Sequence, residues 1–160
     1  MSVSANDRTI LRDLAKRVAE IASLPVMAER RAMWTRHNGL ERVRPMVLVF
    51  PEGSWGELLP QDVLACEGEQ ARRIEWRLRS RIYYHEHLHD DTVIETEWVV
   101  GKVVRNTGWG LSAEHIPATE ARGAWKFRPV INEPADLKKL HFPEVTYDEE
   151  ATQRNLAEAQ

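Results

Sequence analysis

The stretch MVLVFPEGSWG, residues 46–56, is the part of the sequence that most directly predicts the fold. It begins with five consecutive apolar residues at 46–50 and then stops at a turn that contains proline and two glycines. A short run that is apolar on both faces is typical of a strand buried in a parallel sheet, because a strand with one wet face alternates instead. We therefore predict a buried parallel strand at 46–50, with a loop at its carboxyl end.

Helical and extended patterns flank this run. Apolar residues at helical spacing predict a helix at 7–22, and a second helix runs from Pro25, which suits a first turn, to a stop at Gly39. The remaining expected elements are a long helix at 68–89, extended segments at 92–104 and 125–131, a short helix at 135–140, and a last helix opened by a capping box at 146–149.

This alternation predicts an α/β architecture with a parallel sheet. Only about three strands are visible, and so small a parallel sheet would leave both of its edges open. Two alternatives follow from the open edges. Either the domain closes by forming a homodimer, or these 160 residues are the front part of a longer protein.

Composition excludes several classes of function. The single cysteine, Cys66, permits neither an internal disulfide nor a zinc site with several cysteines. A formal net charge of −3 provides no general attraction to nucleic acid or to an anionic membrane surface. No apolar run approaches the roughly 20 residues that span a bilayer. The amino terminus is charged and amphipathic rather than a cleavable leader, so we expect a cytoplasmic protein.

The densest chemical cluster is HEHLHDD, residues 85–91. Within it, His85, Glu86 and His89 match H-E-x-x-H, the pattern in which two histidines bind zinc and the glutamate acts as a base. The match falls where the helix is expected to end, and the longer zincin pattern does not continue. The alternatives are a different site that uses His85 or His87, or a polar helix terminus whose histidines suit the negative end of the dipole.

Two pairs of residues are candidates because of their position. Glu95 and Glu97 lie two apart in an expected strand and would share a face, which makes them interesting if buried and ordinary if exposed. Glu52 and Trp55 follow the expected first strand, at the end where α/β folds bind substrates. An ordinary connecting loop is the alternative for that second pair.

The order of these features resembles the amino-terminal portion of the uroporphyrinogen decarboxylase superfamily, which includes corrinoid-dependent methyltransferases. The resemblance rests on the helices ahead of RPMVLV at 44–49, on the acidic and apolar second segment, and above all on RPVINEPADLKKL at 128–140. It implies the first part of a (β/α)8 TIM barrel, with a helical extension at 1–40 and the first βα units at 41–160. The resemblance also implies that Glu52 and Trp55 lie in the substrate site. Glu95 and Glu97 are the nearest counterparts of the catalytic aspartate.

Departures from the superfamily pattern shape the expected function. Porphyrinogen decarboxylases carry an arginine-rich loop after the first strand, whereas the loop here is acidic and aromatic and would repel a polycarboxylate. The methyltransferase branch activates a thiol on zinc, with ligands from later strands. We therefore expect a protein linked to corrinoid-dependent methyl transfer, which acts on a small-molecule, tetrapyrrole or corrinoid substrate with a corrinoid protein as partner. The isolated chain need not be active.

Three alternative functions remain open. The first is a decarboxylase of the uroporphyrinogen type. The second is a zinc hydrolase that uses His85, Glu86 and His89. The third is a non-catalytic binding module, in which some of the six tryptophans and the open sheet edges would form a partner interface.

Overall fold

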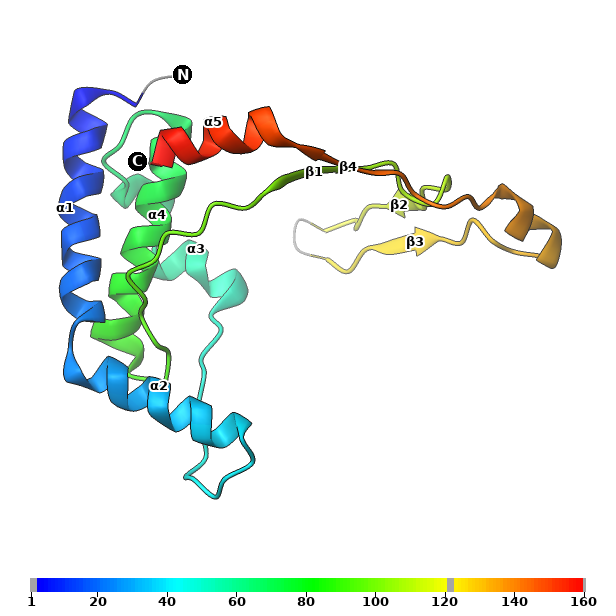
Figure 1. Ribbon diagram of the computed structural model, residues 1–160. Coiled ribbons are helices and arrows are strands. Elements are labelled where there is room, and N and C mark those ends of the chain that lie inside the picture. Colours follow the sequence, from blue (N-terminus) through cyan, green and yellow to red (C-terminus); the bar gives the residue numbers. More distant parts are fainter. Residues whose placement is uncertain (1–2, 121–122, 160) are drawn as a thin grey trace. The chain divides into compact units, whose positions relative to one another are not determined.

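The computed structural model describes residues 3–120 and 123–159. The chain divides into two compact units, one up to Glu97 and one from Trp98 onward, and each is described by itself (Figure 1). The boundary that we expected after residue 40 lies inside the first unit. The first 40 residues therefore belong to the same compact unit as the long helix that follows them.

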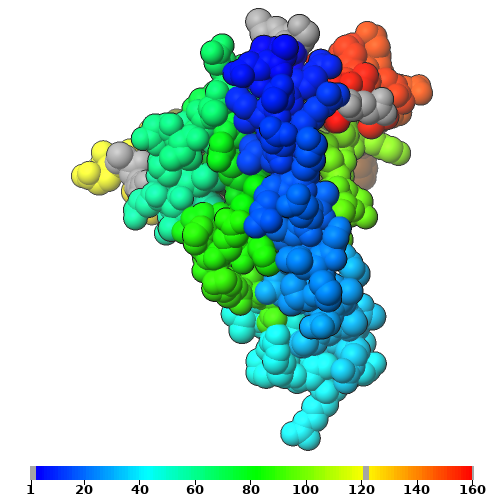
Figure 2. Space-filling model, turned by 90° about the vertical axis from the view of Figure 1, so that its left-hand side faces the viewer, coloured from blue at the N-terminus to red at the C-terminus, as the bar shows by residue number. Residues whose placement is uncertain are grey.

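The first unit is built from helices. It contains α1 (Ala5–Ala22), α2 (Pro25–Asn38) and α4 (Glu69–Tyr83), and α1 lies along α4 (Figure 2). The backbone N–H of Asp7 donates to the Ser4 hydroxyl at the start of α1, and Pro25 opens α2. All three helices were predicted, and the stop of the second at Gly39 is also confirmed.

Shorter turns connect these helices. The segment between α2 and α4 contains the 3-10 turns η1 (Glu52–Ser54) and η2 (Gln61–Val63) and the single-turn helix α3 (Trp55–Leu58). At its carboxyl end α4 continues into a π-helical turn, η3 (Tyr84–Leu88). The predicted helix at 68–89 therefore exists, but its last part has a different winding.

The first unit has a core that joins apolar and acidic side chains. The buried apolar side chains, all within this unit, are Val18, Ile21, Met27, Leu59, Leu64, Cys66, Ala71, Leu78 and Ile94. Glu75 is fully buried beside them, and its carboxylate accepts the backbone N–H groups of Ala65 (2.9 Å) and Cys66 (2.8 Å). Asp7 is buried too and accepts from the N–H groups of Glu67 and Gly68. These two acids satisfy the backbone of the loop ahead of α4.

The expected strand at 46–50 is wrong. The segment is extended, but within the described residues it pairs with no strand, and its backbone bonds instead to the side chains of Asp90 and Asp91. Of the expected strand region at 92–104, only its last residues enter a strand, β1 (Val103–Asn106). A parallel first strand needs a neighbouring strand, and the described part of this unit provides none.

The second unit contains two small antiparallel ribbons. Strand β1 pairs with β4 (Val145–Asp148), and β2 (Glu114–Ile116) pairs with β3 (Lys126–Arg128). The mixed α/β composition is thus confirmed. The expected parallel sheet is wrong for the residues described, since both pairings there are antiparallel.

Two helical segments complete the second unit. The short helix expected at 135–140 is the 3-10 helix η4 (Pro134–Lys139), and the last helix is α5 (Glu149–Ala159). The expected capping residue of α5, Thr146, lies in β4 instead. Asp148 takes its place, because its carboxylate accepts the backbone N–H of Ala151 at 2.9 Å.

The second unit has no apolar core of its own among the residues described. Each buried hydrophobic side chain lies in the first unit, between Val18 and Ile94. Large exposed apolar side chains of the second unit are Val99, Val104, Trp109, Trp125, Phe127, Ile131, Leu137, Leu140, Phe142, Val145, Tyr147 and Leu156. None of the helices in the described ranges combines the length and the apolar character needed to cross a bilayer.

Candidate functional site

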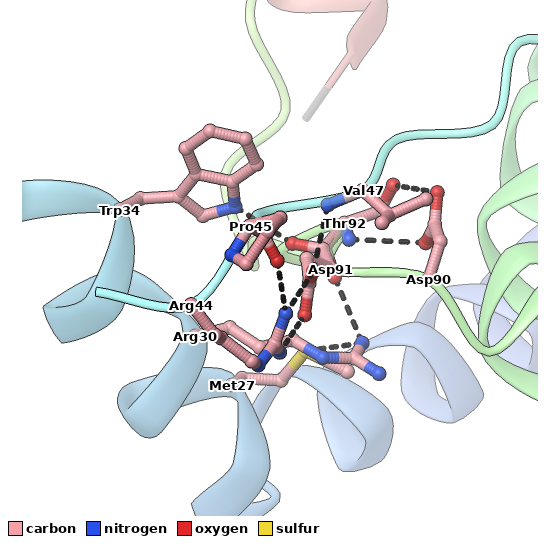
Figure 3. A network of polar contacts seen from close by, with 9 residues as sticks. All are labelled: Met27, Arg30, Trp34, Arg44, Pro45, Val47, Asp90, Asp91 and Thr92. Carbon is pink, nitrogen blue, oxygen red and sulfur yellow. Dashed lines mark hydrogen bonds and ion pairs between the residues drawn. The ribbon is translucent and has the colours of Figure 1, made fainter. Parts of the chain in front are cut away.

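The most connected polar site lies directly after the π-helical turn, at Asp90 and Asp91, and Figure 3 shows it from close by. We call Asp90, Asp91 and Arg44 the aspartate clamp. The chain reaches this site through His89, whose left-handed backbone (φ 49°) ends the helix and turns the chain. Both aspartates are buried. The clamp joins the end of α4 to the extended segment 44–49.

Asp91 makes bonds through its side chain and its backbone. Its carboxylate receives both terminal nitrogens of Arg44, one of them at 2.7 Å, and the backbone N–H of Val47 at 2.8 Å. Its own N–H donates to the carbonyl of Val47 at 2.9 Å. The Asp91 carbonyl accepts the indole N–H of Trp34 at 2.8 Å, which connects the clamp to α2.

Asp90 performs the same task one step along the chain. Its carboxylate accepts the backbone N–H of Val49 at 2.9 Å, and it also accepts the N–H and hydroxyl of Thr92. The carbonyl of Val49 receives the phenolic O–H of Tyr84 at 2.8 Å. From α2, Arg30 donates to the carbonyl of Thr92 at 2.9 Å. The clamp therefore holds one edge of the extended segment, because it binds the backbone groups of every second residue, Val47 and Val49.

Within the clamp, Arg44 stabilises the charged form of Asp91. The bidentate contact with Arg44, helped by the Val47 N–H, lowers the pKa of Asp91 to about 2 despite the opposing effect of burial. The same contact raises the pKa of Arg44 above its ordinary value. Because the donors and acceptors of the clamp are satisfied within the chain, its chemical role is to position the segment and the loop that follows it.

That loop places Trp55 in an aromatic cluster. The ring centroid of Trp55 lies 5.4 Å from that of Trp76, 5.7 Å from Tyr83 and 5.6 Å from Tyr84. Tyr83 in turn lies 4.3 Å from the ring of His87. Edge-to-face and tilted packing of this kind fixes α3 against α4. The substrate-binding candidate Trp55 is thus half-buried and packed, while the other candidate, Glu52, is exposed with a left-handed backbone (φ 46°).

The candidate acids Glu95 and Glu97 do not lie in a strand, so the expectation that they share a strand face is wrong. The Glu95 carboxylate pairs with Arg31 of α2 at 2.7 Å, and the Glu95 side chain is half-buried. Glu97 is exposed, and its backbone carbonyl accepts from Arg81 at 3.4 Å. Arg81 donates in the same way to the backbone carbonyl of Glu95, at 3.4 Å, so the two residues share Arg81 through their backbones, while the ion pair of the Glu95 carboxylate is with Arg31.

The H-E-x-x-H match does not form a zinc site in the described chain. His85 and Glu86 lie in the π-helical turn, whereas His89 follows it in a left-handed conformation, so the α-helical i, i+4 geometry is lost. Glu86 is paired with Arg17 of α1 at 2.9 Å. The buried Nδ1 of His85 has no partner within the described ranges, yet no three metal-binding side chains gather there. The residues present do not fit a zinc ion.

Cys66 is not an activated nucleophile. It is buried, and desolvation together with the neighbouring acids Glu75 and Asp7 raises the pKa of its thiol to about 12. A thiol in this environment stays protonated and inert at neutral pH.

Sequence reasoning missed the clamp residues Asp90, Asp91 and Arg44, and the buried acids Asp7 and Glu75. One signal was available for the two aspartates. Negative charge is unfavourable at the carboxyl end of a helix, so an Asp-Asp pair directly after a helix indicates specific partners. No comparable local signal marks Asp7 or Glu75, which occupy ordinary positions on helices.

Comparisons of the chain with protein-family models, with curated proteins and with solved structures gave no match.

Proposed function

We propose that this chain forms the amino-terminal part of a uroporphyrinogen-decarboxylase-superfamily protein that is linked to corrinoid-dependent methyl transfer. The proposal takes its family from the sequence resemblance at 44–49 and 128–140. In this role the first unit positions the loop that carries Glu52 and Trp55. The second unit buries its own exposed apolar side chains against additional βα units.

The observation that carries the proposal is the open second unit. Its two short ribbons and its helices expose large side chains, with Phe142 85% and Val99 71% accessible, and none of its described apolar residues is buried. A unit of this size normally buries an apolar face against another layer. The proposed additional βα units would supply that layer.

The chemistry of the loop favours methyl transfer over decarboxylation of a polycarboxylate. Residues 50–56 contain an exposed glutamate, Glu52, and an aromatic residue, Trp55, but no arginine. A negatively charged loop disfavours a substrate that carries several carboxylates, whereas the aromatic cluster around Trp55 suits the apolar face of a large ring.

The described residues do not supply the zinc of the methyltransferase branch. No group of three suitable ligands occurs among them, so the metal would be bound by other parts of the protein. We assign no step of the reaction to a metal held by this chain. Its own contribution is positional: the aspartate clamp fixes 44–49, and the aromatic cluster fixes the loop at 52–58.

The test begins with the coding sequence downstream of Gln160. The full reading frame, expressed as one protein, is assayed for thiol-dependent demethylation of methylcobalamin by its absorbance change. We expect turnover, and we expect Trp55→Ala to lower it about tenfold through loss of loop positioning, whereas Val63→Ala, at an exposed position of the first unit outside the loop, leaves it unchanged. A frame with no further βα units, or a full protein that decarboxylates uroporphyrinogen instead, would contradict the proposal.

A further inference from the structure

The extended segment at 42–50, which we call the strap, is attached to the first unit by polar contacts at a single place. The N–H and the carbonyl of Val47 bond to Asp91 at 2.8 and 2.9 Å. Those of Val49 bond to Asp90 at 2.9 Å and to the Tyr84 hydroxyl at 2.8 Å. In the part of the chain that the structure describes, the hydrogen bonds that join the strap to other elements, including those of its Arg44 side chain, all end on Tyr84, Asp90 and Asp91 (Figure 3).

The strap contributes little to the apolar core. None of its residues is buried, and its apolar side chains from Val47 to Phe50 are 37–70% exposed. Every buried apolar side chain among the described residues lies outside it. Elements with few buried apolar contacts open at a lower free energy than the core does. Release of the strap therefore leaves the core side chains in place.

The residues that receive the strap are held without it. The indole N–H of Trp34 donates to the Asp91 carbonyl at 2.8 Å, and Arg30 donates to the carbonyl of Thr92 at 2.9 Å. The Asp90 carboxylate also accepts the N–H and the hydroxyl of Thr92. Because none of these contacts involves the strap, the two aspartates keep their positions when the strap leaves and can bind it again.

Both ends of the strap have the backbone of a hinge. Leu40 precedes it with a φ of 60°, and Glu52 follows it with a φ of 46°. Left-handed backbone is uncommon for residues other than glycine, and each of these two residues lies beside a glycine, Gly39 or Gly53. Hinges are a few residues at the ends of elements that absorb large changes in φ and ψ. The Leu40 side chain is 94% exposed and that of Glu52 is also exposed, so neither is held by packing.

We propose that the strap opens as one piece about its two left-handed ends, while α1, α2 and α4 stay folded. Opening frees the carboxylates of Asp90 and Asp91 and the hydroxyl of Tyr84, whose ring centroid lies 5.6 Å from that of Trp55. The strap is thus a lid beside the aromatic cluster. Its use as a gate for a substrate rests on the proposed function, whereas its opening does not.

The test is hydrogen exchange of the intact native chain, followed by nuclear magnetic resonance at increasing urea concentration. The amides of Val47 and Val49 report on the strap, and those of Ile21 and Leu78 report on the buried faces of α1 and α4. Without urea we expect the two strap amides to be protected, yet to exchange about 100-fold or more faster than the two helix amides. Urea should hardly change the strap rates, because its opening exposes little surface, but it should strongly raise the helix rates.

A single substitution tests whether the strap opens as one piece. Tyr84→Phe keeps the ring and removes the hydrogen bond to the Val49 carbonyl. In a strap that moves as a unit, the Val47 amide, which is bound to Asp91, must then exchange faster by the same factor as the Val49 amide, about fivefold. Tyr83→Phe is the matched control, since it removes a neighbouring hydroxyl that does not bond to the strap, and both amides should keep the parent rates.

Three results would overturn the proposal. Strap amides with the rate and urea dependence of Ile21 and Leu78 would mean that the strap leaves only when the whole unit unfolds. Strap amides without protection would mean that it is not closed in solution. Faster exchange of Val49 alone in Tyr84→Phe would mean that its bonds break one at a time. All three are measured without a substrate, so they are independent of the methyl-transfer assay.

Discussion

Arg44 and Asp91 form a bidentate ion pair across 47 residues of chain, and the Asp91 carboxylate is buried while the Arg44 side chain is 52% exposed. Because the same carboxylate accepts the Val47 N–H, the pair links the extended segment to the end of α4. Its value to the fold is therefore greater than that of a pair of surface charges.

Arg44→Ala leaves the buried Asp91 carboxylate without its main partner. We expect a loss of about 1–3 kcal/mol in the free energy of unfolding, measured by urea denaturation, with the lower part of this range favoured by the exposure of Arg44. Arg36→Ala is the matched control, because Arg36 pairs with Glu41 on the surface, and it should cost less than about 1 kcal/mol. Equal effects of the two substitutions would contradict the role assigned to the clamp.

The low pKa of Asp91 predicts a dependence of stability on pH. Folding lowers this pKa from 3.8 to about 2, so the folded protein holds the proton less tightly than the unfolded chain. The associated stability is therefore complete above the unfolded value and is lost as the pH falls from about 4 to about 2. Unfolding measured from pH 7 to pH 2 should show a smaller acid loss in Asp91→Asn than in the parent chain. Parallel acid curves for the two proteins would exclude this contribution.

The helices of the first unit could be predicted because their signals are local. The apolar spacing at 7–22, Pro25 at the start of α2 and Gly39 at its end each act within a few residues. The extended segment 46–50 could not be interpreted correctly in this way. A short apolar run indicates an extended backbone, but the acceptors of its Val47 and Val49 N–H groups are side chains more than 40 residues away.

The same limit explains the fate of the candidate sites. Glu95 and Glu97 were paired on the assumption of a strand, and without that strand their spacing carries no information about a shared face. H-E-x-x-H was paired on the assumption of an α-helix, which changes winding at Tyr84. Trp55 was chosen for its place after 46–50. Its aromatic partners on α4 could not be inferred, because they depend on how α3 packs against that helix.

The role of Glu75, a buried acid whose carboxylate binds the backbone of a loop, can be tested by substitution. Glu75→Ala leaves the N–H groups of Ala65 and Cys66 without their acceptor, and we expect a loss of about 2–4 kcal/mol in unfolding free energy. Glu69→Ala on the same helix removes an exposed acid that is paired with Arg73 on the surface, and it should change stability by less than about 0.5 kcal/mol. The charge-neutral Glu75→Gln retains an acceptor and should fall between the two.

Trp55 tests whether the aromatic cluster fixes the loop after the extended segment. Trp55→Ala removes ring contacts with Trp76, Tyr83 and Tyr84, and we expect a loss of about 2–4 kcal/mol in stability together with a weaker near-ultraviolet circular dichroism signal. Trp125→Ala is the control, because Trp125 is 55% exposed and packs with His115 and Phe127 on a short ribbon. If the loop were mobile in the parent chain, Trp55→Ala would change the near-ultraviolet circular dichroism signal little, and that result would contradict the role of the cluster. Faster proteolysis within residues 51–58 of the Trp55→Ala variant, at unchanged cleavage elsewhere, would show that the cluster and not the whole unit depends on this ring.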